Sequence, residues 1–284
     1  ACYAVANWRL YGTYAPRDPP TALHHLRLAA GKGHSEAIQA LAYLVAGGTG
    51  GEADPAEGRR LLAPLAEDDP DIAAQLALLD RMAPPEAARD LPRAQLSDDP
   101  WIVRIPGLFT VDECAYLIRA GEPQLRPSFV IDPTSGRPGP HPVRTSSSMN
   151  FAPTAEDLAI NALNRRIAAA TSTAVACGEP LQILRYAPGE QYRRHMDGLS
   201  GVANQRMLTA LVYLNQAYEG GETEFPELGL RCRFDTGDML AFRNAGPDGR
   251  PDPRTLHAGL PVRTGVKWLA SRWIRQQPHD PWDA

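Results

Sequence analysis

The sequence lacks a long hydrophobic run, a cysteine cluster and a strong excess of either charge. No apolar stretch among its 284 residues approaches the roughly 18 residues of a membrane-spanning helix, so no membrane partner is expected. The net charge of −4 offers no concentrated basic face, which argues against nucleic acid as a partner. No secretory signal is recognisable at the start, where the residues are typical of the middle of a helix.

The four cysteines, Cys2, Cys114, Cys177 and Cys232, are scattered, without a CxxC pair or zinc-site spacing. We therefore expect reduced thiols in a cytoplasmic protein. Abundant alanine and arginine indicate a GC-rich bacterial genome. The length predicts two domains, and a hydrophobic content of 43% is sufficient for two ordinary cores.

Residues 1–90 repeat themselves at an offset of 36. A period of this size predicts stacked helical hairpins. Within each repeat, a glycine would end one helix and an aspartate followed by proline would begin the next. The matching pairs include Gly12 and Gly48, Asp18 and Asp54, Pro19 and Pro55, Leu26 and Leu62, and Gln39 and Gln75.

The phrase spanning residues 28–37 resembles the Sel-like repeat, a relative of the tetratricopeptide (TPR) repeat. That resemblance implies a concave surface that binds a partner protein or peptide. The alternative is that so few repeats only brace the domain that follows. Residues 91–100 are rich in Pro, Ala, Asp and Arg, and they are expected to form a linker.

The segment after the linker predicts a strand over residues 101–105 and then a helix. Thr110 and Glu113 have the spacing of a capping box at the start of that helix. Residues 131–142 hold four prolines and two glycines and are expected to form a mobile loop that handles substrate. A strand over 143–151 and an amphipathic helix over 155–173 should follow.

Residues 181–276 contain many short apolar segments separated by glycine and proline turns, a pattern typical of a β-sandwich or barrel. Within them, His195 and Asp197 form an H-x-D pair, and His257 follows sixty residues after the aspartate. On a strand, positions i and i+2 point to the same face. Two imidazoles and one carboxylate are the donors of a facial triad that suits non-haem Fe(II).

The motifs of this region, taken in order, resemble the prolyl 4-hydroxylase family of Fe(II)/2-oxoglutarate dioxygenases, over roughly residues 101–276. The resemblance implies a multi-domain α + β protein, with the helical repeats followed by a double-stranded β-helix (jelly-roll) domain over 101–284, flanked by helices, with its metal-binding core at 181–276. The matching segments are Pro106–Phe109, Glu113–Cys114, Arg144–Ser146, Arg185–Tyr186, Pro188–Gly189, His195–Asp197, Tyr213–Asn215, Gly220–Thr223, Phe225–Pro226, Gly237–Asp238, His257–Gly259, Pro261–Val262 and Gly265–Trp268.

The resemblance also implies roles for individual residues. His195, Asp197 and His257 would bind Fe(II) and form the catalytic centre, and Lys267 would pair with the distal carboxylate of 2-oxoglutarate. A buried cation is tolerated when an anion faces it. Further contacts to the cosubstrate would come from Tyr186, Thr209, Tyr213 and Trp273, and contacts to the substrate from Arg144, Tyr192 and Arg243. Each of these could instead be a core or surface residue.

The leading hypothesis is hydroxylation of an unactivated C–H bond of a prolyl or related residue in a peptide or protein. Dioxygen is then consumed and 2-oxoglutarate becomes succinate and CO2, with ascorbate as a further candidate cofactor. One alternative is oxidation of a free amino acid or a small peptidic natural product by hydroxylation, desaturation or cyclisation. Another is a repeat-type adaptor with an inactive oxygenase fold. Fold alone does not identify the substrate.

Overall fold

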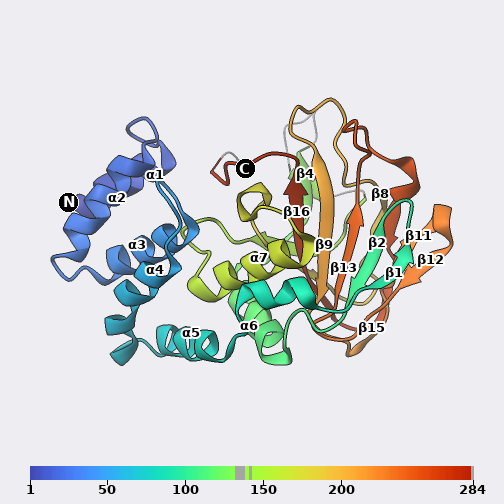
Figure 1. Ribbon diagram of the computed structural model, residues 1–284, viewed down its shortest axis with the longest axis horizontal. Coiled ribbons are helices and arrows are strands. Elements are labelled where there is room, and N and C mark those ends of the chain that lie inside the picture. The colour runs from blue at the N-terminus through green and yellow to red at the C-terminus, as the bar shows by residue number, and fades with distance from the viewer. Residues whose placement is uncertain (132–137, 141–142, 283–284) are drawn as a thin grey trace. The chain divides into compact units, whose positions relative to one another are not determined.

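A computed structural model describes residues 1–131, 138–140 and 143–282. The chain separates into two compact units, which are labelled by their elements in Figure 1. The helical unit comprises Ala1–Pro84, Phe151–Asn164 and the chain end from Pro281. The sheet unit comprises Pro85–Asn150 and Arg165–Asp280.

Five helices follow one another in the first part of the helical unit (Figure 1). Gly12 and Gly48 cap two of them in the left-handed conformation, with φ of 68° and 81°. Asp18 and Asp54 begin the next helices, and each side chain accepts a backbone N–H. These four caps confirm the local prediction from the repeat. The helices are α1 (Cys2–Tyr11), α2 (Pro19–Ala30), α3 (Ser35–Gly47), α4 (Pro55–Leu62) and α5 (Pro70–Arg81).

The helices of this unit approach one another closely because small residues lie between them. A Cβ atom on Gly58 of α4 would lie 2.6 Å from the carbonyl oxygen of Ala42 in α3, so this crossing requires glycine. Leu158 packs in the same cluster as Leu62 and Ile72. The segment 151–164 therefore belongs to the helical unit, although the sequence placed it in the oxygenase domain.

The sheet unit contains two main antiparallel sheets. The larger sheet has the order β1 (Ala94–Ser97), β2 (Ile102–Ile105), β13 (Met239–Arg243), β9 (Arg206–Tyr213), β16 (Lys267–Arg275), β7 (Gln182–Tyr186), β6 (Ser147–Asn150) and β3 (Arg126–Pro127). The smaller sheet has the order β12 (Leu230–Cys232), β11 (Thr223–Phe225), β14 (His257–Gly259) and β8 (Tyr192–His195). Two further pairs join β10 (Tyr218–Gly220) to β15 (Val262–Gly265), and β4 (Phe129–Ile131) to β5 (Pro138–Pro140).

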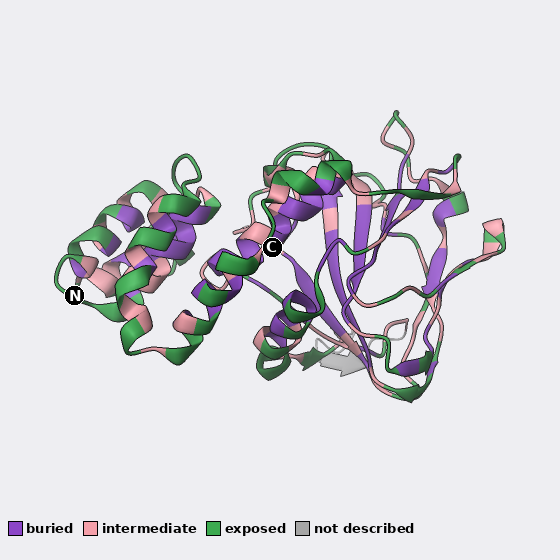
Figure 2. Ribbon diagram, turned by 60° about the horizontal axis from the view of Figure 1, so that its bottom comes forward, coloured by how far each residue is buried: buried purple, intermediate pink, exposed green. Residues whose placement is uncertain are grey.

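The two main sheets share one hydrophobic core. Phe225 and Cys232 of the smaller sheet pack with Leu211, Tyr213 and other buried residues of the larger sheet. Figure 2 shows the buried residues concentrated along the strands of this unit. The alternation of side chains along each strand directs one face of each sheet into this core.

The sheet unit also contains α6 (Val111–Gly121) and the second part of α7 (Leu158–Thr171), which begins in the helical unit. The predicted capping box is present at the start of α6, where Thr110 and Glu113 exchange hydrogen bonds. Glu113 also forms a buried ion pair with Arg166 of α7, at 2.7 Å. The short 3₁₀ helices are Ala63–Glu67, Pro85–Asp90, Glu122–Gln124, Val175–Cys177, Pro226–Leu228 and Pro253–Thr255.

Some expected elements differ in the structure. The expected linker over 91–100 contains β1, which extends the larger sheet beside β2. The strand expected over 143–151 is shorter, at Ser147–Asn150. The expected mobile loop over 131–142 lies partly outside the described residues. Its described residues, Ile131 and Pro138–Pro140, belong to the paired strands β4 and β5. None of the helices in the described part of the chain has the length and apolar character needed to cross a bilayer.

Candidate active site

The three predicted metal ligands meet at the edge between β8 and β14. His195 ends β8 and lies opposite His257, which begins β14. Asp197 follows in the turn after β8, so it reaches the imidazoles from a turn rather than from the expected strand position. One ligand atom from each residue lies within 4.8 Å of the other two.

Both imidazoles are oriented by backbone carbonyl groups. Nδ1 of His195 lies 2.8 Å from the carbonyl oxygen of Arg193, and Nδ1 of His257 lies 3.0 Å from that of Thr255. With Nδ1–H donating to these carbonyls, each Nε2 is left facing Asp197, at 3.6 Å from one of its carboxylate oxygens. A metal-binding histidine characteristically has its second nitrogen held in this way.

The charges in the triad fit a divalent cation. Burial and the neighbouring His257 lower the pKa of His195 to about 4, so its imidazole is neutral at pH 7. Burial alone would raise the pKa of Asp197, but His257, His195 and the Thr209 hydroxyl hold it below its usual value. Asp197 is therefore an ionised carboxylate with only 5% of its surface exposed. A buried anion beside a neutral imidazole needs a compensating cation, and Fe(II) would supply it.

A cavity opens beside the triad, and the predicted residues Arg144, Tyr186, Tyr192, Lys267 and Trp273 all line it. One wall comes from alternate residues of β16, where positions 267, 269, 271 and 273 face the same way. Positions 182, 184 and 186 of the neighbouring strand β7 extend this wall. Gln182 and Ser271 were not predicted to line the cavity. Each lies at an even spacing from a predicted residue on its strand, so the alternation of side chains could have identified both.

Lys267 carries an ammonium group into this cavity with 2% of its surface exposed. Its Nζ donates to the carbonyl oxygen of Gly221 at 2.6 Å and lies 5.6 and 5.5 Å from the ring centres of Tyr186 and Tyr213. Burial lowers the pKa of Lys267 to about 7. The charge of Glu222 opposes this shift, but no carboxylate in the described part of the chain forms an ion pair with Lys267. An anionic ligand would stabilise its charged form, and the distal carboxylate of 2-oxoglutarate fits that requirement.

Gly221 is part of this arrangement because its backbone is in the left-handed region, with φ of 66°. A Cβ atom at this position would lie 3.2 Å from Cδ of Lys267 and 3.0 Å from Val262. Glycine therefore allows the carbonyl group to approach the ammonium. The Gly-Gly turn that precedes β11 thus positions Lys267 as well as reversing the chain.

Three residues predicted to contact ligands do not line the cavity. Thr209 lies beneath the triad, where its hydroxyl donates to Asp197. The Tyr213 hydroxyl is buried against Thr223, at 3.1 Å, with its ring beside Lys267. Arg243 is exposed, and its guanidinium carbon lies 6.0 Å from the ring centre of Trp101. Direct ligand contacts by these three residues remain predictions.

The two other predicted substrate contacts lie together at the cavity. The ring of Tyr192 stacks on His195, with ring centres 3.4 Å apart and planes 10° apart. Arg144 lies 5.4 Å from the Tyr192 ring and donates hydrogen bonds to Ser146 and Gln182. Burial raises the pKa of Tyr192 to about 12, so its hydroxyl is protonated at neutral pH and can donate.

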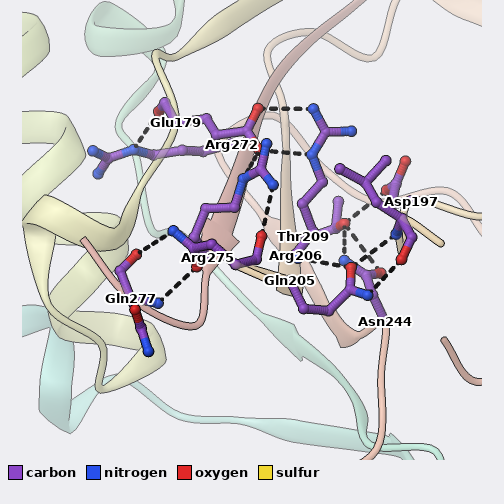
Figure 3. A network of polar contacts seen from close by, with 11 residues as sticks. Glu179, Asp197, Gln205, Arg206, Thr209, Asn244, Arg272, Arg275 and Gln277 are labelled. Carbon is purple, nitrogen blue, oxygen red and sulfur yellow. Dashed lines mark hydrogen bonds and ion pairs between the residues drawn. The ribbon is translucent and has the colours of Figure 1, made fainter. Parts of the chain in front are cut away.

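Sequence reasoning missed a polar network around Glu179 (Figure 3). Arg206 donates two hydrogen bonds to Glu179, at 2.6 and 2.8 Å, and its guanidinium carbon lies 3.8 Å from the Trp273 ring centre. Arg275 also pairs with Glu179. The stacked guanidinium holds the Trp273 ring in the wall of the cavity that Asp197 also lines.

Comparisons with known proteins agree with this geometry. Residues 181–275 match the family model described as the 2OG-Fe(II) oxygenase superfamily. Prolyl 4-hydroxylase 1 of Arabidopsis thaliana is 34% identical over 201 residues, which cover 64% of this chain and 71% of the relative. Prolyl 4-hydroxylase 5 of the same plant is 34% identical over 203 residues, which cover 63% and 69%.

A solved structure is also similar. The viral collagen prolyl hydroxylase of Paramecium bursaria Chlorella virus-1, in its 2-oxoglutarate complex, aligns with a TM-score of 0.51 and 30% identity. The alignment covers 63% of this chain and 98% of the viral chain. The ligand set that this fold requires, His195, Asp197 and His257, is complete in this chain.

Proposed function

Because the chain belongs to the prolyl 4-hydroxylase family of 2OG-Fe(II) oxygenases, we propose that it hydroxylates a prolyl residue of a peptide or protein. It is a 2-oxoglutarate-dependent dioxygenase, with Fe(II), 2-oxoglutarate and O2 as its cofactor and cosubstrates. When bound, these groups supply the oxidising chemistry, and 2-oxoglutarate leaves as succinate and CO2. The prolyl substrate is supported by the relatives, which are named as prolyl hydroxylases.

The protein residues bind and orient the reactants. His195, Asp197 and His257 would hold the iron, and Lys267 would receive the distal carboxylate of 2-oxoglutarate. The observation that carries this proposal is the buried ammonium of Lys267, which lines the same cavity as the triad. Among the described residues it forms no ion pair, and Glu222 acts on it only as a neighbouring charge. Tyr186 and Trp273 would border the cosubstrate, while Tyr192 and Arg144 would meet the substrate and exclude water.

The experiment that tests this function measures succinate formed from 2-oxoglutarate in air with Fe(II). His195→Ala should abolish it, and Lys267→Ala should weaken binding of 2-oxoglutarate. Candidate substrates are then compared as proline-containing peptides against free amino acids, with a product heavier by one oxygen as the readout. Absence of succinate and of Fe(II) binding by the wild-type protein would refute the proposal.

Oxidation of a free amino acid or small peptidic product is the competing outcome of the same assay. A free amino acid needs a group that binds its carboxylate, and Arg144 is the cavity cation nearest Tyr192. Its guanidinium is already engaged by Ser146 and Gln182, which favours the peptide substrate. A product found only with free amino acids would reverse this choice.

Other parts of the assignment are also proposals. The 36-residue recurrence of the caps supports Sel-like repeats over residues 1–90, and we propose that they bind a protein or peptide partner.

Two facing antiparallel sheets support a double-stranded β-helix over 101–284. The four free cysteines support a cytoplasmic location, and the abundance of alanine and arginine supports a bacterial origin. We further propose that ascorbate stimulates turnover, as the family resemblance suggests.

A further inference from the structure

Asp197 does not stand alone beneath the metal site, because two buried side chains continue from it into the core. Thr209 Oγ lies 2.7 Å from Oδ2 of Asp197, and Nδ2 of Asn244 lies 2.9 Å from Thr209 Oγ. Only 1% of the surface of Thr209 and of Asn244 is exposed. Figure 3 shows the three side chains in sequence, with Thr209 in the middle.

The chemistry of the three groups determines which one donates in each of these hydrogen bonds. An ionised carboxylate can only accept, so the single hydroxyl proton of Thr209 must point at Asp197. Thr209 can then only accept from Asn244, which must present its N–H. The structure agrees, since Nδ2 of Asn244 is closer to Thr209 Oγ than Oδ1 is, at 2.9 against 3.2 Å.

We propose that Asn244 is a positioning residue for the metal centre. Its amide holds the Thr209 proton on Oδ2 of Asp197, which fixes the plane of the carboxylate relative to the two imidazoles. Outer hydrogen bonds of this kind orient metal ligands and tune their affinity. The inference rests on the proposed metal-binding role of Asp197.

The backbone of Asn244 also lies against the turn that carries Asp197. Its N–H donates to the carbonyl oxygen of Met207, and its carbonyl oxygen accepts from Asp252, both at 2.9 Å. A Cβ atom on Gly198, the residue after Asp197, would lie 3.1 Å from that same carbonyl oxygen. The turn that carries Asp197 thus packs directly against the backbone of Asn244, while the side chain of Asn244 reaches Asp197 through Thr209.

The variant Asn244→Asp tests whether Asn244 donates to Thr209. It keeps the shape of the side chain and replaces the amide N–H donor with a carboxylate oxygen, which can only accept. Two carboxylates would then compete for the Thr209 proton, and Asp197 would lose its fixed donor. The added negative charge attracts a cation by itself, so the single variant is not decisive. A double-mutant cycle with Thr209→Val separates the two effects, since the charge is added in both backgrounds.

The measurement is the dissociation constant of Co(II) in the absence of oxygen, together with the visible ligand-field spectrum of bound Co(II). We expect Thr209→Val to weaken binding by about 10- to 100-fold, and Thr209→Ser to stay within about threefold of wild type. Asn244→Asp should weaken binding at least about tenfold more in the wild-type background than in Thr209→Val. Thr171→Val, which removes a hydroxyl bonded to Ile167 in α7, is the matched control and should change nothing.

Equal fold-changes for Asn244→Asp in both backgrounds would overturn the inference, and so would a Thr209→Ser protein as weak as Thr209→Val. If Asn244→Asp fails to fold, Asn244→Leu replaces it in the cycle. Asn244→Leu offers no hydrogen-bond donor. It must therefore weaken Co(II) binding when Thr209 is present, and it must leave binding unchanged in the Thr209→Val background. Failure of the wild-type protein to bind Co(II) would instead refute the metal-binding role of Asp197, a distinguishable outcome.

Discussion

Two buried cations in the sheet unit have opposite surroundings. Arg166 of α7 meets the carboxylate of Glu113 at 2.7 Å, and both side chains are almost fully buried. Lys267 of β16 is equally buried, but its ammonium contacts a carbonyl group and two aromatic rings. Glu222 raises its pKa by charge alone, and no carboxylate among the described residues forms an ion pair with it. A scaffold cation is stabilised by a permanent partner, whereas a cation at a binding site leaves its partner to the ligand. The difference marks the cavity as a place for an anion.

Removing a metal ligand should have the largest effect on activity. It tests whether the cavity that contains Lys267 is the catalytic site. We expect His195→Ala to reduce succinate formation by about 100-fold or more, because losing a ligand exceeds the 10- to 100-fold cost of losing an outer partner. Arg166→Lys, which keeps the scaffold charge, should retain turnover. The assay is succinate release with Fe(II) in air, and undiminished turnover in His195→Ala would contradict the assigned triad.

The two cations should respond oppositely to replacement by methionine. Arg166→Met leaves the Glu113 carboxylate buried and unpaired, which should cost about 3–5 kcal/mol of unfolding free energy. Adding Glu113→Leu to Arg166→Met should recover most of that loss, because an apolar pair of similar volume is well tolerated. Denaturant unfolding of the single and double variants measures both values. A double variant as unstable as the single one would show that the pair itself stabilises the core.

Lys267→Met should weaken 2-oxoglutarate binding by about 100-fold or more while stabilising the ligand-free protein by a few °C. The folded-state pKa of about 7 lies below the unfolded value, so the folded protein binds fewer protons. The stability of the wild type should therefore rise as the pH increases from about 7 to about 10. The advantage of Lys267→Met should be greatest below pH 7 and vanish near pH 10. Thermal melts at several pH values check this, and an advantage independent of pH would contradict it.

The residues that act directly on the ligands could be predicted from the sequence, but the residues that position them could not. The order His195, Asp197, His257 and Lys267 identified the site because those side chains act directly on the ligands. Asn244 and Glu179 were missed, since they act through other residues and occupy no recognisable spacing. Thr209 was assigned to the cosubstrate from its position on a strand. That position shows which face of the sheet the side chain points to, but it does not show that the hydroxyl meets Asp197. The 36-residue recurrence gave the helix caps, whereas the return of residues 151–164 to the helical unit depends on long-range packing.

Binding of 2-oxoglutarate should be accompanied by proton uptake that depends on Lys267. Near pH 8 the ammonium is largely deprotonated in the ligand-free cavity, since burial lowers its pKa to about 7. An anionic ligand raises that pKa, so binding should take up close to one proton at pH 8 and much less at pH 6. Calorimetry with Co(II)-loaded protein in buffers of different ionisation enthalpy measures the uptake. Lys267→Arg is the control because a guanidinium stays charged, and uptake unchanged in that variant would assign the proton to another group.

The smallest effect should come from the helical unit, where the polar groups that begin helices are satisfied locally. Asp54 caps α4 by accepting the backbone N–H of Glu57 at 2.8 Å, and Asp18 caps α2 in the same way. Asp54→Ala should lower the unfolding free energy of this unit by about 1 kcal/mol, while Asp54→Asn should cost only a few tenths. Neither change should alter succinate formation, because no ligand depends on these carboxylates. Differential hydrogen exchange over α3 and α4 with a parallel succinate assay checks both statements. A fall in succinate formation with Asp54→Ala alone would show that the helical unit contributes to the cavity and that the contrast between scaffold and site extends beyond the sheet unit.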